Sequence, residues 1–328
     1  MLLRILKSNT LFSALLIPVI GLLFWMHSLQ APQLLNLNLV NCAMPLYYVV
    51  FEHLKDQGFW QVFIAFCLVL VNSFFVAQLG SSFLFLKKRS YLPGIIYLIT
   101  VSSIPSLQSL LPVHLATLFV LTATYFILGT YHNVEIAFTF NASFFLAIAS
   151  LFYLPVVVLF PLVWISIFIL QKDDNWRLPI IPILGFGIPW LFMWAYAFLN
   201  DTYASLWNEL TTMIFTYHNS YLLEPLFLVP TVVIVILSTL GSFSVISVYH
   251  RMKVSTRKYF VIFYWMLGLI LVSALGLITI GEEIVALSTF PVSYFISHYL
   301  VSDQKHLFKE VLTWTFVATM ITVLVLHP

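Results

Sequence analysis

The sequence predicts an all-α fold, a polytopic transmembrane helical bundle of about eleven helices in one integral membrane domain. Of the 328 residues, 62% are hydrophobic and only 8% are charged, whereas soluble domains carry about 25% charged residues. Polar breaks divide the chain into apolar runs of membrane-spanning length, and the basic residues fall between alternate runs. A soluble core cannot hide this much apolar surface, so we expect membrane lipids to cover it.

The apolar runs set the expected spans. A hydrocarbon core of about 30 Å takes roughly 20 helical residues. The first run follows Arg4 and Lys7, as in a signal peptide, but no small-residue cleavage site follows it, so we interpret it as an uncleaved helix. The fifth and sixth runs are short and meet at Tyr153, which fits two tight helices or one re-entrant hairpin. The expected spans are 11–29, 60–86, 91–109, 114–130, 138–152, 154–170, 178–199, 225–248, 259–279, 285–301 and 308–326.

The charges predict an orientation with the N-terminus inside and the C-terminus outside. With that alternation, every one of the 14 Lys and Arg residues except Lys55 falls on the cytoplasmic side, as the positive-inside rule requires. More than half of the 12 acidic residues fall on the outer side: Glu52, Asp56, Asp201, Glu209, Glu224, Glu282 and Glu283.

Two outer segments are long, at about residues 30–59 and 200–224, and both predict interfacial helices. Residues 44–55 read as a short amphipathic helix with Pro45 in its first turn. Its aromatic side chains are expected in the interface and its polar residues in water. The second segment carries Trp207, an aromatic residue typical of headgroup level.

The first outer segment holds the catalytic candidates Glu52, His53 and Asp56. Glu52 and Asp56 are four residues apart and would share a helix face. Two carboxylates beside an imidazole can bind a divalent cation or act as a general base. The alternative is a solvated polar face, partly neutralised by Lys55.

Five residues are candidates for substrate binding. Glu282 and Glu283 follow a glycine in a very short outer turn, where adjacent carboxylates usually keep the turn in water and only sometimes line a cleft. Asp201 and Glu209 share the second outer segment with His218. The full set of substrate-binding candidates is Lys55, Asp201, Glu209, Glu282 and Glu283.

The cytoplasmic side has two basic clusters that fit an anionic lipid headgroup or a phosphate, and that equally fit a plain topology signal. Within the expected spans the Asp, Glu, Lys, Arg and His residues are few, namely His27, His114 and His298, with Lys309 and Glu310 at the start of the last span. This scarcity counts against an ion-coupled transporter. Metalloprotease, hydrolase and ATPase motifs are missing. The basic clusters are Lys87, Lys88 and Arg89, and Arg251, Lys253, Arg257 and Lys258.

Residues 88–94, 112–116 and 140–155 resemble an uncharacterised family of bacterial polytopic inner-membrane proteins (a domain of unknown function). The quoted stretches begin with Lys-Arg-Ser-Tyr-Leu-Pro-Gly, Pro-Val-His-Leu-Ala and Phe-Asn-Ala-Ser-Phe-Phe. The resemblance covers most of the chain. It implies a location in the bacterial inner (cytoplasmic) membrane and no established activity.

The order of elements over residues 90–170 distantly resembles GT-C glycosyltransferases. A tight helical hairpin leads to Leu-Ala-Ile-Ala-Ser-Leu-Phe-Tyr-Leu-Pro at 146–155 and then to an apolar helix. Those enzymes use polyprenyl-phosphate-linked sugars at the outer face, with a carboxylate in the first outer loop as base or metal ligand. Here residues 36–41 lack the early acid of that loop, and Glu52 is the first one available.

The resemblance therefore implies a GT-C-like glycosyltransferase, a polyprenyl-phosphate sugar as partner and a divalent metal as the one cofactor to consider. The alternative is a non-catalytic membrane subunit or scaffold of a cell-envelope assembly, whose partners would be other envelope membrane proteins. A lipid or solute transporter ranks third, and no feature indicates nucleic-acid binding.

Overall fold

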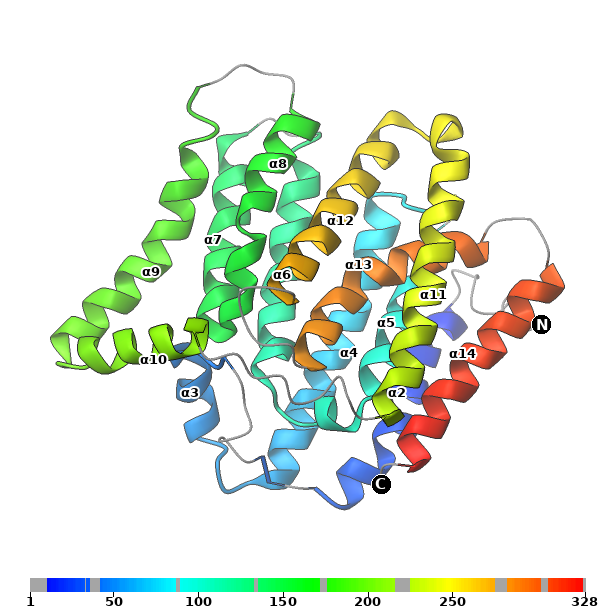
Figure 1. The fold of residues 1–328 in the computed structure, drawn as a ribbon, viewed down its shortest axis with the longest axis horizontal. Coiled ribbons are helices and arrows are strands. Elements are labelled where there is room, and N and C mark those ends of the chain that lie inside the picture. The colour runs from blue at the N-terminus through cyan, green and yellow to red at the C-terminus, as the bar shows by residue number, and fades with distance from the viewer. Residues whose placement is uncertain are drawn as a thin grey trace.

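The computed structural model describes residues 11–32, 34–35, 42–86, 89–132, 135–171, 176–215, 225–274, 282–301 and 306–326. Over these residues the chain forms thirteen α-helices and three 3-10 helices. The described ranges contain no β-strand, only one isolated β-bridge. The all-α prediction is confirmed (Figure 1).

The helices follow one another through short connections. In chain order the elements are α2 (Leu11–Gln30), α3 (Pro45–Glu52), α4 (Gly58–Ser82), α5 (Leu92–Ser102), η2 (Pro105–Gln108), α6 (Pro112–Gly129), α7 (Ile136–Phe152), η3 (Leu154–Leu159), α8 (Pro161–Leu170), α9 (Ile181–Leu199), α10 (Tyr203–Phe215), α11 (Pro225–Val248), η4 (Tyr249–Arg251), α12 (Val254–Val272), α13 (Glu282–Val301) and α14 (His306–Leu326).

Every expected span overlaps one of these helices. Seven helices of the described ranges are long and apolar enough to cross a membrane, and three shorter apolar segments accompany them. The chain is therefore a multi-pass membrane protein. The fifth and sixth spans form an antiparallel pair, in which α7 runs one way and η3 with α8 returns (Figure 1). The span number and the N-inside orientation stay predictions.

The third span is shorter than the sequence predicts. Instead of reaching residue 109, α5 ends at Ser102, and the 3-10 helix η2 follows. At this break one side chain satisfies a freed backbone carbonyl, as a bundle interior requires, and a second bonds to the side chain of the same residue. Gln108 Nε2 donates to the Ser102 carbonyl at 2.6 Å, and Trp25 Nε1 donates to the Ser102 hydroxyl at 2.8 Å.

The centre of the bundle is α5, all of whose residues are buried. It packs against α2, α4, α13 and α14. Gly94 allows this close approach, because a Cβ atom there would lie 2.4 Å from the Ser73 carbonyl oxygen of α4. The Ser73 hydroxyl donates to the Gly94 carbonyl at 2.9 Å, which ties the two helices together.

The break between α7 and η3 is bound by the first outer segment. Tyr153 is extended there, and Ala43 forms an antiparallel β-bridge with it. The Met44 N–H donates to the Phe152 carbonyl and the Leu154 N–H to the Cys42 carbonyl, both at 3.2 Å. Residues 42–44 thus satisfy backbone groups that the helix break leaves open.

The two ends of the bundle differ. The α3–α10 end is the end at which α3 and α10 lie, and α10 runs across the direction of its neighbours (Figure 1). The basic end is the opposite one, with the α8–α9 and α11–α12 connections and the basic residues Arg177, Arg251 and Lys253. The helices expected in the two outer segments therefore exist and lie at one end.

Candidate functional site at the α3–α10 end

The aromatic face of α3 packs on protein rather than lying in the membrane interface. Tyr47 and Phe51 are fully buried, whereas Tyr48 and Val49 are exposed. The Tyr47 hydroxyl donates to the Leu110 carbonyl at 2.7 Å. Burial raises the pKa of the Tyr47 phenol, and the nearby Glu283 carboxylate raises it further.

The expected shared helix face of Glu52 and Asp56 is wrong, because α3 ends at Glu52 and residues 53–56 form turns. Gln61 of α4 fixes these turns by donating to the Leu54 carbonyl at 2.8 Å and to the Lys55 carbonyl at 3.2 Å. All four polar candidates of this segment are exposed: Glu52, His53, Lys55 and Asp56.

His53 caps its own helix. It is the C-cap residue of α3, and its Nδ1 lies 2.9 Å from the Val49 carbonyl, to which it donates. The described residues contain no group of three or more His, Cys, Asp or Glu side chains that could hold a metal ion. A divalent metal at Glu52 and Asp56 stays a prediction.

Asp201 has a structural position at the end of α9. It is exposed and adopts the left-handed conformation with φ 53°. Its N–H donates to the Phe198 carbonyl at 3.3 Å, and the Thr202 N–H donates to the Ala197 carbonyl at 2.9 Å. These two bonds form a Schellman motif. Asp201 therefore turns the chain from α9 into α10.

Glu209 of the second outer segment lies near Tyr48 of the first. It is exposed on α10, whose Leu206 and Leu210 are buried. Tyr48 on α3 is exposed at its edge, but partial desolvation still raises the pKa of its phenol, and the negative charge of the nearby Glu209 raises this pKa further. His218 and Glu224 lie outside the described residues.

Glu283 differs from every other acidic candidate because it is buried. Only 6% of its surface is exposed, and its Oε2 atom has no hydrogen-bond partner. It lies in the first turn of α13, beside Tyr153, Tyr47 and the half-buried Glu282. The Tyr153 hydroxyl is fully buried beside this carboxyl group, and it has no other hydrogen-bond partner.

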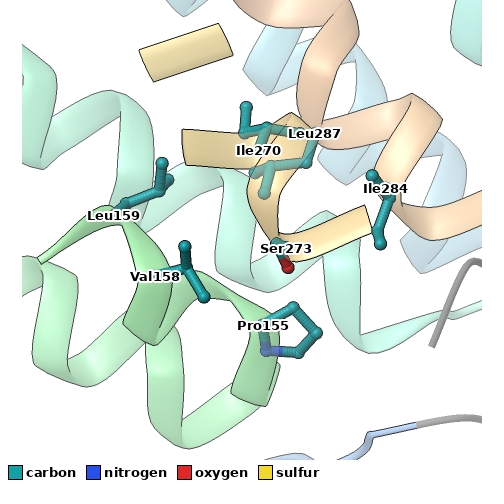
Figure 2. A pocket seen from close by; sticks show the side chains of 7 residues that line it. All are labelled: Pro155, Val158, Leu159, Ile270, Ser273, Ile284 and Leu287. Carbon is teal, nitrogen blue, oxygen red and sulfur yellow. The ribbon is translucent and has the colours of Figure 1, made fainter. Parts of the chain in front are cut away.

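A narrow apolar crevice lies between η3, the end of α12 and the start of α13 (Figure 2). In this structure it is too narrow for a water molecule. Figure 2 shows the Ser273 hydroxyl between η3 and Ile284, and this buried hydroxyl has no hydrogen-bond partner. The crevice is lined by Pro155, Val158, Leu159, Ile270, Ser273, Ile284 and Leu287.

The structure therefore brings Glu283 close to Tyr153, a pair that the sequence alone does not connect. The sequence makes Glu283 a substrate-binding candidate in a turn whose carboxylates usually lie in water, and it singles out neither Tyr153 nor Ser273. The local signal for Tyr153 is the Tyr-Leu-Pro break between two apolar runs. Nothing local indicates that residues 42–44 would pair with the backbone of this break, or that Glu283 would be buried beside Tyr153.

A buried carboxylate without a hydrogen-bond partner indicates a binding or catalytic site in a membrane protein. Burial of a polar group without a hydrogen bond costs free energy, so Oε2 of Glu283 is a ready acceptor for a ligand proton or cation. Ionisable groups inside transmembrane bundles usually mark substrate or ion sites. We therefore regard Glu283, with Tyr153 beside it, as the centre of the candidate site.

The chain matches the model of one protein family, described as a family of unknown function (DUF6427), over residues 86–327. The match includes Glu283, Tyr153, Asp201 and Glu209, and it begins after the α2–α4 segment that contains Glu52. No curated protein and no solved structure matches the chain. Because the family match covers well over half of the residues, this protein belongs to the family of unknown function DUF6427.

Proposed function

We propose that this multi-pass membrane protein acts on a lipid-borne substrate at the α3–α10 end, with Glu283 as its acid–base residue. The observation that supports this most is the buried Oε2 atom of Glu283, which has no hydrogen-bond partner. A carboxylate with a free lone pair in a low-dielectric site is a suitable general base. Tyr153 beside it supplies a hydroxyl that can orient the incoming group.

The surrounding elements suit a substrate that stays in the membrane. α10 lies across the bundle with Trp207 exposed, and α3 lies next to it through Tyr48 and Glu209. Amphipathic helices such as α10 lie in the membrane interface. A lipid headgroup at that depth would face the junction of α3, η3 and α13.

The specific reaction that we propose is glycosyl transfer from a polyprenyl-phosphate-linked sugar at the outer face of a bacterial inner membrane. Glu283 would take the proton of the acceptor hydroxyl. The acceptor oxygen would then bond to the sugar carbon, and the polyprenyl phosphate would leave that carbon. The support for this reaction is the GT-C-like order of elements over residues 90–170. Glu283 takes the role that the sequence alone suggested for Glu52 or Asp56.

A transporter is the second candidate, and Glu283 itself favours it, because acidic residues within membrane helices mark ion pathways. The sequence alone places a transporter third, because few ionisable residues fall within the expected spans. A transporter would bind its solute or cation without chemical turnover. The two candidates differ in whether the bound species is consumed.

Native mass spectrometry of the full chain, gently extracted from its own membranes, tests the proposal. We expect a co-purifying polyprenyl-phosphate species that is lost in Glu283→Gln. Glu135→Gln removes an exposed acid at the basic end and serves as the control that retains the lipid.

Other outcomes of this experiment are equally informative. Loss of the lipid in the Glu52→Ala/Asp56→Ala double variant, with Glu283→Gln unaffected, would move the site to the end of α3. A stoichiometric protein partner without any such lipid would overturn the proposal and favour a non-catalytic subunit of an envelope assembly.

A further inference from the structure

A second group of buried, unpartnered polar atoms lies at the basic end, where the end of α8, the start of α12 and the turn after α6 meet. Both amide atoms of Gln171, just after α8, have no hydrogen-bond partner. The Tyr259 hydroxyl in α12 is also without one. Gln171 is about nine-tenths buried and Tyr259 is 1% exposed.

The Lys258 ammonium contacts a neighbour of each of these two residues. Lys258 Nζ lies 3.5 Å from the carbonyl oxygen of Leu170, the residue before Gln171. The same ammonium lies 5.4 Å from the centre of the Tyr131 ring. The Tyr131 ring in turn meets the Tyr259 ring edge-on, with centroids 5.8 Å apart. Gln171, Lys258 and Tyr259 are thus connected through shared neighbours.

The chemistry of the three side chains is that of a phosphate site. An amide N–H, an ammonium and a phenolic O–H are all donors, and hydrogen bonds from such donors to an anion are the strong ones. Buried polar atoms without partners are rare in folded proteins and call for a ligand, water or ion. Gln171 offers one donor and one acceptor, the Tyr259 hydroxyl can donate, and the positive charge of Lys258 favours an anion.

The distribution of basic residues over the protein also favours a phosphate at this end. The same end holds Arg177, Arg251, Lys253 and Arg257, whereas the α3–α10 end has Lys55 alone among the described Lys and Arg residues. Basic pockets between transmembrane helices bind the phosphates of anionic lipids. The distributed charge attracts an anion, and the buried donors give it a fixed place.

We propose that Gln171, Lys258 and Tyr259 form a binding site for a phosphate group, carried by an anionic lipid headgroup or by a free phosphate. The site is independent of the proposed function, because it lies at the other end of the bundle. A plain topology signal would need exposed charges only and would leave the buried Gln171 and Tyr259 without a role.

Binding to the delipidated full chain in a neutral detergent tests this proposal. Inorganic phosphate is one probe and short-chain phosphatidylglycerol the other, with choline chloride at equal ionic strength as the reference. A saturable rise of the unfolding temperature with inorganic phosphate identifies a free phosphate. A rise with the lipid alone, with one lipid retained in native mass spectra, identifies a headgroup.

Two variants and two matched controls make the test specific. Lys258→Gln and Tyr259→Phe should each weaken binding about tenfold or more, as expected for losing one hydrogen bond to a charged group. Lys253→Gln removes the same charge from an exposed position at the same end, and Tyr196→Phe removes an exposed hydroxyl. Both controls should bind within about twofold of the unchanged protein.

Tyr259→Phe keeps the proposal falsifiable if Lys258→Gln folds poorly. It deletes a buried hydroxyl that has no partner, so the ligand-free variant should unfold at or above the original temperature. Unchanged affinity in Tyr259→Phe would overturn the proposal. Equal losses in Lys253→Gln and Lys258→Gln would also overturn it, since they would indicate diffuse attraction by charge alone.

Discussion

The two ends of the bundle bury opposite kinds of polar group. At the α3–α10 end the buried group is an acid, Glu283, which lies among tyrosines and has an unpartnered oxygen. At the basic end the buried groups are the neutral amide of Gln171 and the phenol of Tyr259, whose donors lie near the ammonium of Lys258. An acid attracts protons and cations, whereas donors attract anions. The two ends are therefore expected to bind different ligands, and one variant at each end can separate them.

The largest effect is expected in the centre that both ends share. Gly94→Val places side-chain atoms against the Ser73 carbonyl, where a Cβ would already lie at 2.4 Å. We expect a loss of about 3 kcal/mol in the free energy of unfolding, because the backbones of α4 and α5 must separate. Thermal unfolding should show the loss of stability. Ligand binding, measured separately at each end, should weaken at both ends together.

Gly187→Ala is the matched control for that change. A Cβ at this position in α9 would meet no atom within 4 Å, so the helix gains roughly 0.5–1 kcal/mol from the lost glycine flexibility. Loss of binding at only one end in Gly94→Val would contradict the idea that α5 supports both.

Tyr47→Phe comes next in size and contrasts with Tyr259→Phe. The Tyr47 hydroxyl donates to the Leu110 carbonyl at 2.7 Å, so its removal leaves a buried acceptor open and should cost about 1–2 kcal/mol. The Tyr259 hydroxyl has no partner, so its removal should cost nothing. Chemical denaturation of both variants measures the difference, and equal losses would refute the contrast.

Asp201→Gly separates a structural from a substrate-binding role at the α3–α10 end. Asp201 has φ 53°, which glycine adopts without the steric cost of a Cβ. We expect a gain of roughly 0.5–1 kcal/mol in unfolding free energy, with lipid co-purification unchanged. A folded variant that loses the lipid would assign the carboxylate to the substrate site.

The smallest effect is expected for Glu52→Gln and Asp56→Asn. Both side chains are exposed, and exposed substitutions usually change stability by less than about 0.5 kcal/mol. Unfolding temperatures within error of the original protein would agree with this. A large shift in either variant would show an ionic contact at the end of α3.

The sequence is sufficient to predict the helices and insufficient to predict the buried polar groups. Apolar runs determine where helices form, and Pro45 correctly marks the start of α3. The early end of α5 depends on Gln108 and Trp25, which are distant in sequence from each other. Residues expected at a polar turn, such as Glu283, become buried only when another segment covers them.

The same limit explains the candidate site. Asp201 and Glu52 look alike in sequence, as acids in outer segments, yet one forms a helix-ending motif and the other lies at a helix end in solvent. Gln171 and Tyr259 carry no motif at all. They become candidates because their buried polar atoms have no hydrogen-bond partner. Only the packed structure shows whether a buried atom has such a partner.

The bridge between Ala43 and Tyr153 also sets an order of events during synthesis. Residue 43 leaves the ribosome about 110 residues before its partner, a delay on the order of 10 s at 5–20 residues per second. Until residue 154 is made, residues 42–44 lack the backbone partners that they have in the folded protein. The first outer segment can therefore complete its packing only after the fifth expected span has been synthesised.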